Sequence, residues 1–539
     1  MTKKITLAAF ATLQAASLWA YSPVLEDSTK KAPKDWFHTD QKNSKMFGVS
    51  TEKAYELLKG RISQTVVVAV IDSGIDIFHE DLKDIIWKNP KEVAGNGIDD
   101  DKNGYIDDIY GWNFIGGKDG KHVAQDTYEL TRMYQLLSKK YEGKSQDEAA
   151  DKAEYQKYTT IKELYESKKS EAQMEAMGFM MFYGNYQRFE RLMKAYLDTD
   201  SLSEDQLKEI ESQDETIAKA QEVLLGMYQK GISPKQLQEY SEYLTKKVKF
   251  HYNLDFDSRQ IVGDDYANLS EKFYGNNDVK GPDPDHGTHV AGIIAASRKN
   301  SLGIKGIADN VQIMVIRAVP DGDERDKDVA NAIYYAVDNG AKIINMSFGK
   351  AYSPNQELVE KAIRYAEEKG VLLVHAAGND AKNTEKEPNY PTPFYSTKAK
   401  ASNWVEVGAS SWKEGEKLPA EFSNYGKTSV DLFAPGVDIY STTPENNYAN
   451  HNGTSMAAPV VAGVAAMVLS YFPHLNAVQL KDILMKSSIK LNKQSVQMPS
   501  EDAEDAKKVT FGELSVTGGV VNAVEAVKMA QKIKITKKK

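Results

Sequence analysis

The 539-residue sequence contains no cysteine. This absence excludes disulfide bonds, thiol catalysis, cysteine-ligated zinc and the lipid-bearing cysteine of a bacterial lipoprotein. An excess of basic residues is also missing, since 68 Lys and Arg face 77 Asp and Glu and the formal net charge is −9. Nucleic-acid binding requires a basic surface, so we expect no nucleic-acid partner. A chain without disulfides can gain stability from a bound metal ion instead.

Long hydrophobic runs are scarce, and the N-terminal one is short. Lys3 and Lys4 precede an apolar run over Ile5–Leu13, and small residues follow over Ser17–Ala20. This order is typical of a secretory signal peptide. The alternative is an uncleaved membrane anchor, but the run falls short of the roughly 20 apolar residues that cross a bilayer. The sequence therefore predicts a signal peptide over 1–20 and export to the extracellular space, the periplasm or the cell envelope.

Proline is absent between Pro90 and Pro234. Within that interval, the residues from about Gln125 to Phe250 are dense in Glu, Lys, Gln, Tyr and Leu, which favours amphipathic helices. Helix starts are predicted where a capping residue and its partner are correctly spaced, namely Ser145 with Glu148, Ser203 with Gln206, and Ser233 before Pro234. We expect three or four long helices, packed through apolar positions such as Leu192, Leu224 and Leu244.

The flanking parts of the sequence follow a different pattern. Thr65–Ile71 is a continuous β-branched run, typical of a strand buried on both faces of a parallel sheet. From Val290 onward, strand-like runs alternate with helical segments, which predicts an α/β fold with helices on both faces of a parallel sheet. The expected strands are 311–319, 343–348, 371–376 and 404–409, and the helices between them include 329–338 and 357–368. We expect an N-terminal segment at 21–60, an α/β domain over 61–118 and 255–530, an all-α insertion over 119–254, and a basic tail at 531–539.

Three short segments of the expected α/β domain carry residues suited to catalysis. Asp72 ends the buried run, His286 comes directly before an apolar helix, and Ser455 lies just before another. In parallel sheets, functional sites gather at the carboxyl ends of strands. A histidine can take the serine proton during nucleophilic attack, and a carboxylate holds that histidine in the required orientation. Each residue alone is usually a cap or a structural residue, but the combination favours a serine-nucleophile site.

The segments Val70–Gly74, Asp285–Gly292 and Asn452–Pro459 resemble the corresponding motifs of the subtilisin (subtilase) family, in the same chain order. The resemblance extends over about 60–118 and 255–530. It implies a three-layer α/β fold with a parallel sheet. It also implies a serine endopeptidase that acts through an acyl-enzyme intermediate, with a catalytic triad of Asp72, His286 and Ser455.

Further segments share this resemblance and imply roles in substrate binding. Ala376–Asn379 resembles the family's oxyanion-hole segment, which makes Asn379 a donor to the tetrahedral intermediate. Ile344–Gly349 resembles the strand that pairs with substrate backbone, through Ser347, Phe348 and Gly349. Asn389 corresponds to the base of the primary specificity pocket. Because that segment contains nothing cationic, we expect the pocket to accept medium to large apolar or aromatic side chains.

Other histidines compete with His286 for attention. His289 follows it by three positions, but the family uses the first histidine of His-Gly-Thr-His, so His289 is expected to be structural. His79 matches a surface loop of the family and is also expected to be structural. His375, beside the oxyanion-hole segment, has no assigned role.

The acid-rich stretch Asn96–Asp108 is a candidate calcium loop. Counted from Asp99, oxygen-bearing side chains fall at positions 1, 3 and 5 and a glycine at position 6, as in an EF-hand. Position 12 is Tyr110 rather than glutamate, so Asp107 or Asp108 would supply the missing carboxylate. Carboxylates this close repel one another without a cation, although an acidic surface turn is the alternative. The predicted ligands are Asp99, Asp101, Asn103, Tyr105, Asp107 and Asp108, and the family resemblance implies a second calcium site at Asp81, Asn300, Leu302 and Ile304.

The sequence departs from the family pattern in two ways. Asp72 and His286 lie 214 positions apart, where the family needs only a few dozen. The insertion accounts for this spacing and is expected near the rim of the site, where it could select substrates, bind a protein partner or only decorate the surface. Roughly forty residues separate the signal peptide from the core, fewer than the family's chaperone-like propeptide, so the activation route stays open.

Two other functions compete with proteolysis. A binding protein with a vestigial site would have lost a triad or oxyanion residue, and all of them are present. A serine esterase could use the same machinery, but the sequence lacks the Gly-x-Ser-x-Gly elbow of the α/β-hydrolase fold. We therefore expect polypeptide substrates.

Overall fold

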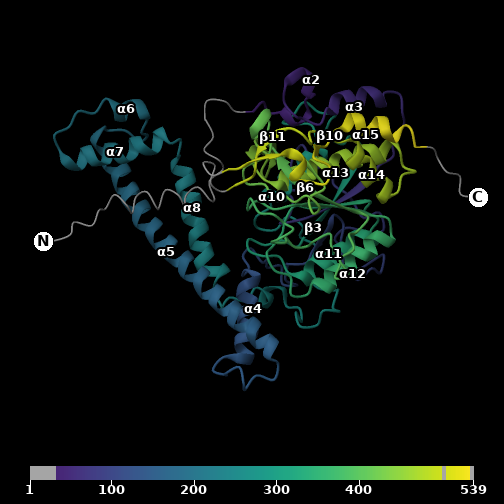
Figure 1. The fold of residues 1–539 in the computed structure, drawn as a ribbon, viewed down its shortest axis with the longest axis horizontal. Coiled ribbons are helices and arrows are strands. Elements are labelled where there is room, and N and C mark those ends of the chain that lie inside the picture. The colour runs from purple at the N-terminus through teal and green to yellow at the C-terminus, as the bar shows by residue number, and fades with distance from the viewer. Residues whose placement is uncertain (1–31, 501–505, 534–539) are drawn as a thin grey trace, which may run out of the picture. The chain divides into compact units, whose positions relative to one another are not determined.

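The computed structural model describes residues 32–500 and 506–533. The predicted signal peptide at 1–20 and most of the predicted basic tail lie outside these residues. The chain divides into two compact units. The first, here called the α/β unit, comprises Ala32–Glu129 and Asp257–Lys539. The second, the helical unit, comprises Leu130–Phe256, and Figure 1 labels the elements of both.

A nine-stranded sheet forms the centre of the α/β unit, in the order β10-β13-β7-β6-β5-β4-β1-β3-β2. Every neighbouring pair is parallel except β10 with β13 at one edge. The strands are β1 Val66–Asp72, β2 Gly111–Asn113, β3 Val311–Arg317, β4 Ile343–Met346, β5 Leu372–Ala376, β6 Trp404–Ser410, β7 Leu432–Pro435, β10 Ile489–Lys490 and β13 Gly519–Val520. Two antiparallel pairs lie outside the sheet, β8 Ile439–Thr443 with β9 Asn447–His451, and β11 Ser495–Gln497 with β12 Lys508–Thr510. The predicted α/β fold and its main strands are confirmed.

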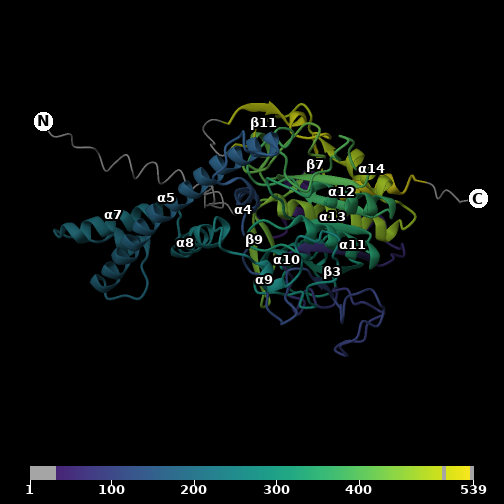
Figure 2. The same ribbon diagram turned by 90° about the horizontal axis from the view of Figure 1, so that it is seen from below.

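Helices cover both faces of this sheet (Figure 2). Val68 and Val70 of β1 pack in one hydrophobic cluster with residues of α10 and α13. Ala69 and Ile71, which alternate with them, pack in a second cluster with residues of α11 and α12. Alternate side chains of a strand point to opposite faces, so β1 is buried on both sides, as its β-branched run predicts. The helices are α2 Gln41–Ser44, α3 Thr51–Leu58, α9 Arg259–Val262, α10 Asp285–Ala295, α11 Asp326–Asp338, α12 Gln356–Glu368, α13 Thr454–Tyr471, α14 Ala477–Ser487 and α15 Ala523–Ala530, with 3-10 turns at Trp36–His38, Gly415–Lys417 and Phe511–Glu513.

Helix α13 is the central helix of the first cluster. Among the described residues, it alone is long and apolar enough to cross a membrane. However, 89% of that stretch is buried inside the protein. It is therefore a core helix, and its apolar composition reflects contact with the sheet and the neighbouring helices.

The helical unit contains one helix much longer than the others. This helix, α5, spans 45 residues from Lys152 to Tyr196. The first helix, α4, begins at Glu129, which is the last residue of the preceding α/β segment. The complete set is α4 Glu129–Tyr141, α5 Lys152–Tyr196, α6 Glu204–Lys208, α7 Glu215–Gln229, α8 Pro234–Lys246 and a π-helical turn at Lys247–His251.

Two of the three predicted helix starts are confirmed. Ser203 and Ser233 cap α6 and α8, each in a complete capping box with the glutamine three residues on. The prediction at Ser145 is wrong. Its hydroxyl donates to Glu148 at 2.8 Å instead of accepting from the backbone, and the chain forms a turn there. The helix begins later because Asp151 accepts from two backbone N–H groups and caps α5.

The helical unit has a hydrophobic core of its own. Phe179, Tyr186 and Met193 of α5 are buried against α7 and α8. Leu224 and Leu244 are buried in the same cluster, as predicted, whereas Leu192 is only partly buried at its edge. This unit therefore encloses apolar side chains independently of the sheet.

Candidate active site

The end of β1 and the start of α10 bring an aspartate and a histidine together. Asp72 is the last residue of β1 and is buried, and His286 is the second residue of α10. The distance from His286 Nδ1 to Asp72 Oδ1 is 2.7 Å. Two glycines permit this approach, because a Cβ atom on Gly287 would lie 2.2 Å from the carbonyl oxygen of Gly74. The glycines beside both motifs thus have a packing role.

The charge of Asp72 controls the protonation of His286. Burial by the surrounding protein lowers the pKa of His286, but the charge and hydrogen bond of Asp72 raise it. Asp285 and Asp283 act in the same direction, and the net result is a raised pKa for His286. An imidazolium formed during a reaction would therefore be stabilised in place.

Ser455 is the second residue of α13, at the N-terminal end of the helix. Its hydroxyl donates to the carbonyl oxygen of Ser347 at 3.1 Å. In return, the Ser347 hydroxyl donates to the carbonyl oxygen of Ser455 at 2.9 Å. Transfer of the Ser455 proton to His286 requires the hydroxyl to turn away from Ser347, a change that a bound substrate can induce because catalytic contacts often tighten only in the complex.

Asn379 and Gly453 lie close to Ser455. Asn379 accepts hydrogen bonds through its amide oxygen from the backbone and hydroxyl of Thr454, at 2.8 and 2.9 Å. This orients the Asn379 Nδ2 atom toward Gly453. The position of a Cβ on Gly453 would be 3.5 Å from both Asn379 Nδ2 and the Ser455 backbone nitrogen. Gly453 has a φ of +152° and leaves this position free, so two N–H donors can converge on an oxyanion there.

The predicted substrate-binding residues lie next to one another. Gly349 lies so close to Asn389 that an added Cβ would be 2.4 Å from its side-chain amide. The Asn389 Nδ2 atom donates to the carbonyl oxygen of Ala376 at 3.1 Å, which ties it to the oxyanion-hole segment. Phe348 is partly buried and packs against the cluster that contains α11 and α12. Ser347 thus contacts Ser455 directly, while Gly349 and Asn389 lie against each other.

Four other histidines have partners in the structure. His289 is buried, contacts the carbonyl oxygen of Ala449 at 3.1 Å, and has a pKa well below its usual value because of burial. His79 contacts the carbonyl oxygen of Asn447 at 3.1 Å. His375 is buried against the carboxylate of Glu406, at 3.1 Å. Sequence reasoning missed His451, whose ring stacks on His289 and whose Nε2 atom lies 3.3 Å from Asp285.

Part of the acidic loop forms a cluster of carboxylates. Glu92, Asp99 and Asp101 each place a carboxylate oxygen within 4.8 Å of the others, and all three are half-buried. Carboxylate oxygens are the donors that Ca²⁺ prefers, so this set fits the cation. Glu92 was not among the predicted ligands, because it lies outside the EF-hand spacing that starts at Asp99. The only local signal for it is its position just before the acid-rich stretch Asn96–Asp108.

The other predicted ligands of this loop face elsewhere. Asp107 accepts backbone hydrogen bonds from Gly95 and Gly97, at 2.8 and 2.9 Å. Asp108 is buried and accepts from Tyr335 at 2.6 Å, and burial raises its pKa to about 6 against the effect of its donors. Tyr105 is buried among aromatic rings. The Asn103 side chain bridges the two groups, because its oxygen accepts from the Tyr105 backbone and its nitrogen donates to Asp108.

The second predicted calcium ligands are also close in space. Asn300 donates to Asp81 at 2.8 Å. The backbone nitrogen of Ile304 lies 3.4 Å from the other Asp81 oxygen, and that of Leu302 lies 3.2 Å from the side-chain oxygen of Asn300. Both Asp81 oxygens therefore accept hydrogen bonds from the 300–304 loop, and the predicted ligands are adjacent.

A nucleophile, a histidine–aspartate pair and two convergent N–H donors at the carboxyl ends of parallel strands fit the class of serine hydrolases. The model of the Subtilase family matches residues 63–512. Because this match covers most of the sequence, the chain belongs to the subtilase family.

Three relatives illustrate the similarity. Over 217 residues, the chain is 42% identical to the thermophilic serine proteinase of Bacillus sp. (strain AK1). This matched stretch covers 40% of this chain and 48% of that protein. The chain is 42% identical over 186 residues to thermitase of Thermoactinomyces vulgaris, or 34% and 61% of the two chains. It is 36% identical over 208 residues to subtilisin DY of Bacillus licheniformis, or 38% and 71%. The matched part thus spans about half of the first relative and about three fifths of the second.

Proposed function

We propose that this protein is a serine endopeptidase that hydrolyses peptide bonds in polypeptide substrates. The observation that supports this most strongly is the 2.7 Å contact between His286 and Asp72. Membership of the subtilase family supports the same reaction.

The residues have distinct roles in the proposed mechanism. Ser455 attacks the peptide carbonyl while His286 takes its proton, and Asp72 holds the imidazole and stabilises its charge. Asn379 Nδ2 and the Ser455 N–H donate to the oxyanion. His286 then protonates the leaving amine, which departs. In the second half of the reaction His286 takes a proton from water, the water attacks the acyl-enzyme, and His286 returns the proton to the Ser455 oxygen. The base must start neutral, so activity should fall as the pH drops through the raised pKa of His286.

Labelling with a serine-directed fluorophosphonate tests this proposal. The reagent should add once, to Ser455, as located by peptide mass mapping. Ser455→Ala should not be labelled, while the control Ser396→Ala, at an exposed serine, should be labelled like the unchanged protein. Unlabelled protein should cleave a peptide library at internal bonds, and labelled protein should not. Labelling at another serine, or a library left intact by the unlabelled protein, would contradict the assignment.

We propose that substrate binds as an added strand beside Ser347–Gly349, with the side chain before the cut directed toward Asn389. The close contact of Gly349 with Asn389 supports a pocket closed by an amide. We expect medium to large apolar or aromatic side chains at this position. A strict requirement for an acidic side chain, read from the same library, would contradict it.

We propose that Glu92, Asp99 and Asp101 hold a structural Ca²⁺ ion. The short distances between their carboxylate oxygens support this, because a divalent cation would offset their mutual repulsion. The hydrogen bond between Asn103 and Asp108 would stabilise the conformation of the loop, and Asp107 would fix the turn at 95–97. A second ion at Asp81, Asn300, Leu302 and Ile304 is proposed on the family resemblance and on the proximity of these residues.

We propose that the insertion predicted at 119–254 is a helical module that controls which protein substrates reach the site. Its own hydrophobic core supports its independence, and the triad and oxyanion residues all lie outside it. The alternative is that it only decorates the surface. A related proposal is that this module binds a protein partner.

We propose that the protein is exported through the signal peptide at 1–20. One relative supports this by its name, the cell wall-associated protease of Bacillus subtilis (strain 168), which is 33% identical to the chain over 253 residues. N-terminal sequencing of the protein recovered outside the cytoplasm tests it, and an N-terminus that still carries residues 1–20 would contradict it.

A further inference from the structure

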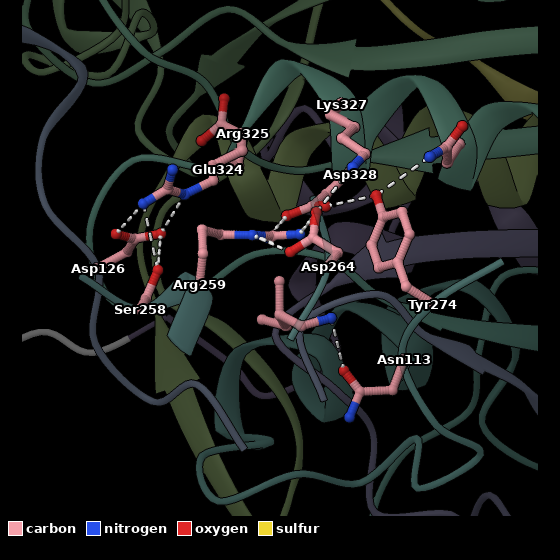
Figure 3. Close-up of polar contacts among 12 residues, drawn as sticks. Asn113, Asp126, Ser258, Arg259, Asp264, Tyr274, Glu324, Arg325, Lys327 and Asp328 are labelled. Atoms are coloured by element: carbon pink, nitrogen blue, oxygen red, sulfur yellow. Dashed lines mark hydrogen bonds and ion pairs between the residues drawn. The ribbon is translucent and has the colours of Figure 1, made fainter. Parts of the chain in front are cut away.

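Buried charges surround the two places where the chain leaves and re-enters the α/β unit (Figure 3). On the leaving side, Asp126 accepts from Arg325 at 2.8 Å and from Ser258 at 2.7 Å. On the returning side, Arg259 donates to Asp264 and to Asp328, both at 2.7 Å. The partners Arg325 and Asp328 lie at the start of α11. Residues at the start of α11 therefore form buried ion pairs with both ends of the insertion.

Lys350, next to the proposed substrate-binding segment, also contacts the start of α11. It follows Gly349 directly, and its side chain is only 2% exposed. Its Nζ atom lies 2.7 Å from a carboxylate oxygen of Glu129 and 2.8 Å from one of Asp326, and it donates to the carbonyl oxygen of Glu324 at 2.9 Å. Glu129 is the first residue of α4, and Asp326 is the first residue of α11.

The backbone of Lys350 pairs with the segment that contains Asn389. Its N–H donates to the carbonyl oxygen of Tyr390 at 2.9 Å, and its own carbonyl oxygen accepts from Tyr390 at 2.8 Å. Tyr390 follows Asn389. One residue thus connects the segment Ser347–Gly349, the segment at Asn389, and the root of the first inserted helix.

A buried ion pair is poor evidence for stability, because the cost of desolvating both charges offsets most of their attraction. Its geometry, however, is specific, since removing one partner leaves an uncompensated buried charge. A lysine that forms such pairs directly after the substrate-binding segment is therefore better explained by positioning than by stability.

We propose that Lys350 is a positioning residue that fixes the substrate-binding segment Ser347–Gly349 to Glu129, at the root of the insertion. This proposal rests on the proposed function, because it assumes that the segment binds substrate. Lys350 acts through the backbone of Gly349 and does not take part in the chemistry. Because Lys350 contacts Glu129, the first residue of α4, a shift of this residue would change the position of the substrate-binding segment and hence the affinity for substrate.

Glu129→Gln and Lys350→Met, singly and together, test this link. We expect each single change to raise the KM of a six-residue peptide about tenfold, since small displacements of substrate-positioning groups have large effects, while kcat changes less than about threefold. The double variant should be no worse than the single ones, because coupled residues are non-additive. The rate of fluorophosphonate labelling at Ser455 should stay unchanged, since this reagent does not require the substrate-binding segment.

Lys400→Met is the matched control. It removes a half-buried lysine that lies 2.6 Å from a buried carboxylate, Asp431, and should leave KM unchanged. Thermal melting of each variant shows that it is folded, and Glu129→Gln carries the test if Lys350→Met does not fold. An unchanged KM in folded Glu129→Gln, or an equal rise in Lys400→Met, would overturn the positioning role. Absence of labelling and cleavage in the unchanged protein would instead overturn the proposed function.

Discussion

The two units use charged residues in opposite ways. In the helical unit, ion pairs such as Lys162 with Glu166 and Lys194 with Glu190 lie along the surface of α5, and the core is aromatic and aliphatic. In the α/β unit, Lys327 and Asp264 are completely buried and 2.7 Å apart. Exposed pairs add little to stability, whereas a buried charge depends strictly on its partner. The comparison teaches that the α/β unit fixes its geometry with fully buried charges, whereas ion pairs of the helical unit, such as Lys247 with Glu175, stay partly exposed around an apolar core.

The largest contrast should come from the nucleophile. Ser455→Ala or His286→Ala should lower kcat by about 10⁶, because triad members act as a unit. The double variant should be no slower than the single ones. No single substitution in the helical unit should approach this loss. The measurement is peptide hydrolysis at saturating substrate, and near-normal turnover by Ser455→Ala would show that the site lies elsewhere.

The next effect tests the geometry of the oxyanion space. Asn379→Ala should lower kcat by about 10²–10³ with little change in KM, because the lost donor acts on the transition state. Thr454→Val, which removes a hydroxyl that orients Asn379, should cause a smaller loss of the same kind. Steady-state kinetics on one peptide decide this, and an effect confined to KM would contradict the assigned role.

Stability separates the two units directly. Arg259→Met should destabilise the α/β unit by about 3–5 kcal/mol, because Asp264 and Asp328 would lose a buried partner. Lys162→Met, on the surface of α5, should leave the free energy of unfolding unchanged within error. Urea unfolding of both variants provides the comparison. Equal effects would show that the two kinds of ion pair do not differ as proposed.

Removing the helical unit should change substrate choice more than chemistry. A short Gly/Ser linker in place of 130–256 should keep hydrolysis of a small peptide within about tenfold, since surface insertions are tolerated well. Cleavage of folded proteins should change much more, as read by mass spectrometry of the products. Failure to fold would show that the insertion is integral to the core, and an unchanged product pattern would leave it as decoration.

The smallest effect should come from calcium. EDTA should lower the melting temperature by a few degrees relative to millimolar Ca²⁺, because binding to the folded state stabilises it by mass action, and initial activity should change less. Asp99→Asn with Asp101→Asn should remove the difference, whereas the control Asp147→Asn, at an exposed carboxylate, should retain it. A melting temperature that is equal in both buffers would exclude a structural ion.

Local patterns predicted the fold but not its long-range contacts. The run Thr65–Ile71 predicted β1 because a doubly buried strand requires continuous apolar residues, and the triad candidates stood in short motifs with their own glycines. Ser145 misled because a serine and a glutamate three residues apart also stabilise a turn. Lys350 and Glu129 are 221 positions apart, and no spacing rule relates them. Glu92 was missed for a similar reason, since only the folded loop brings it to Asp99 and Asp101.

Gly453 has a consequence for which substitutions this position can accept. Any other residue at this position would carry a Cβ atom, and that atom would occupy the space 3.5 Å from Asn379 Nδ2 and from the Ser455 nitrogen. No choice of rotamer or side-chain chemistry can avoid this, because the Cβ position is set by the backbone. Every substitution of Gly453 therefore places a carbon atom in the same space, and we expect each such variant to lower kcat.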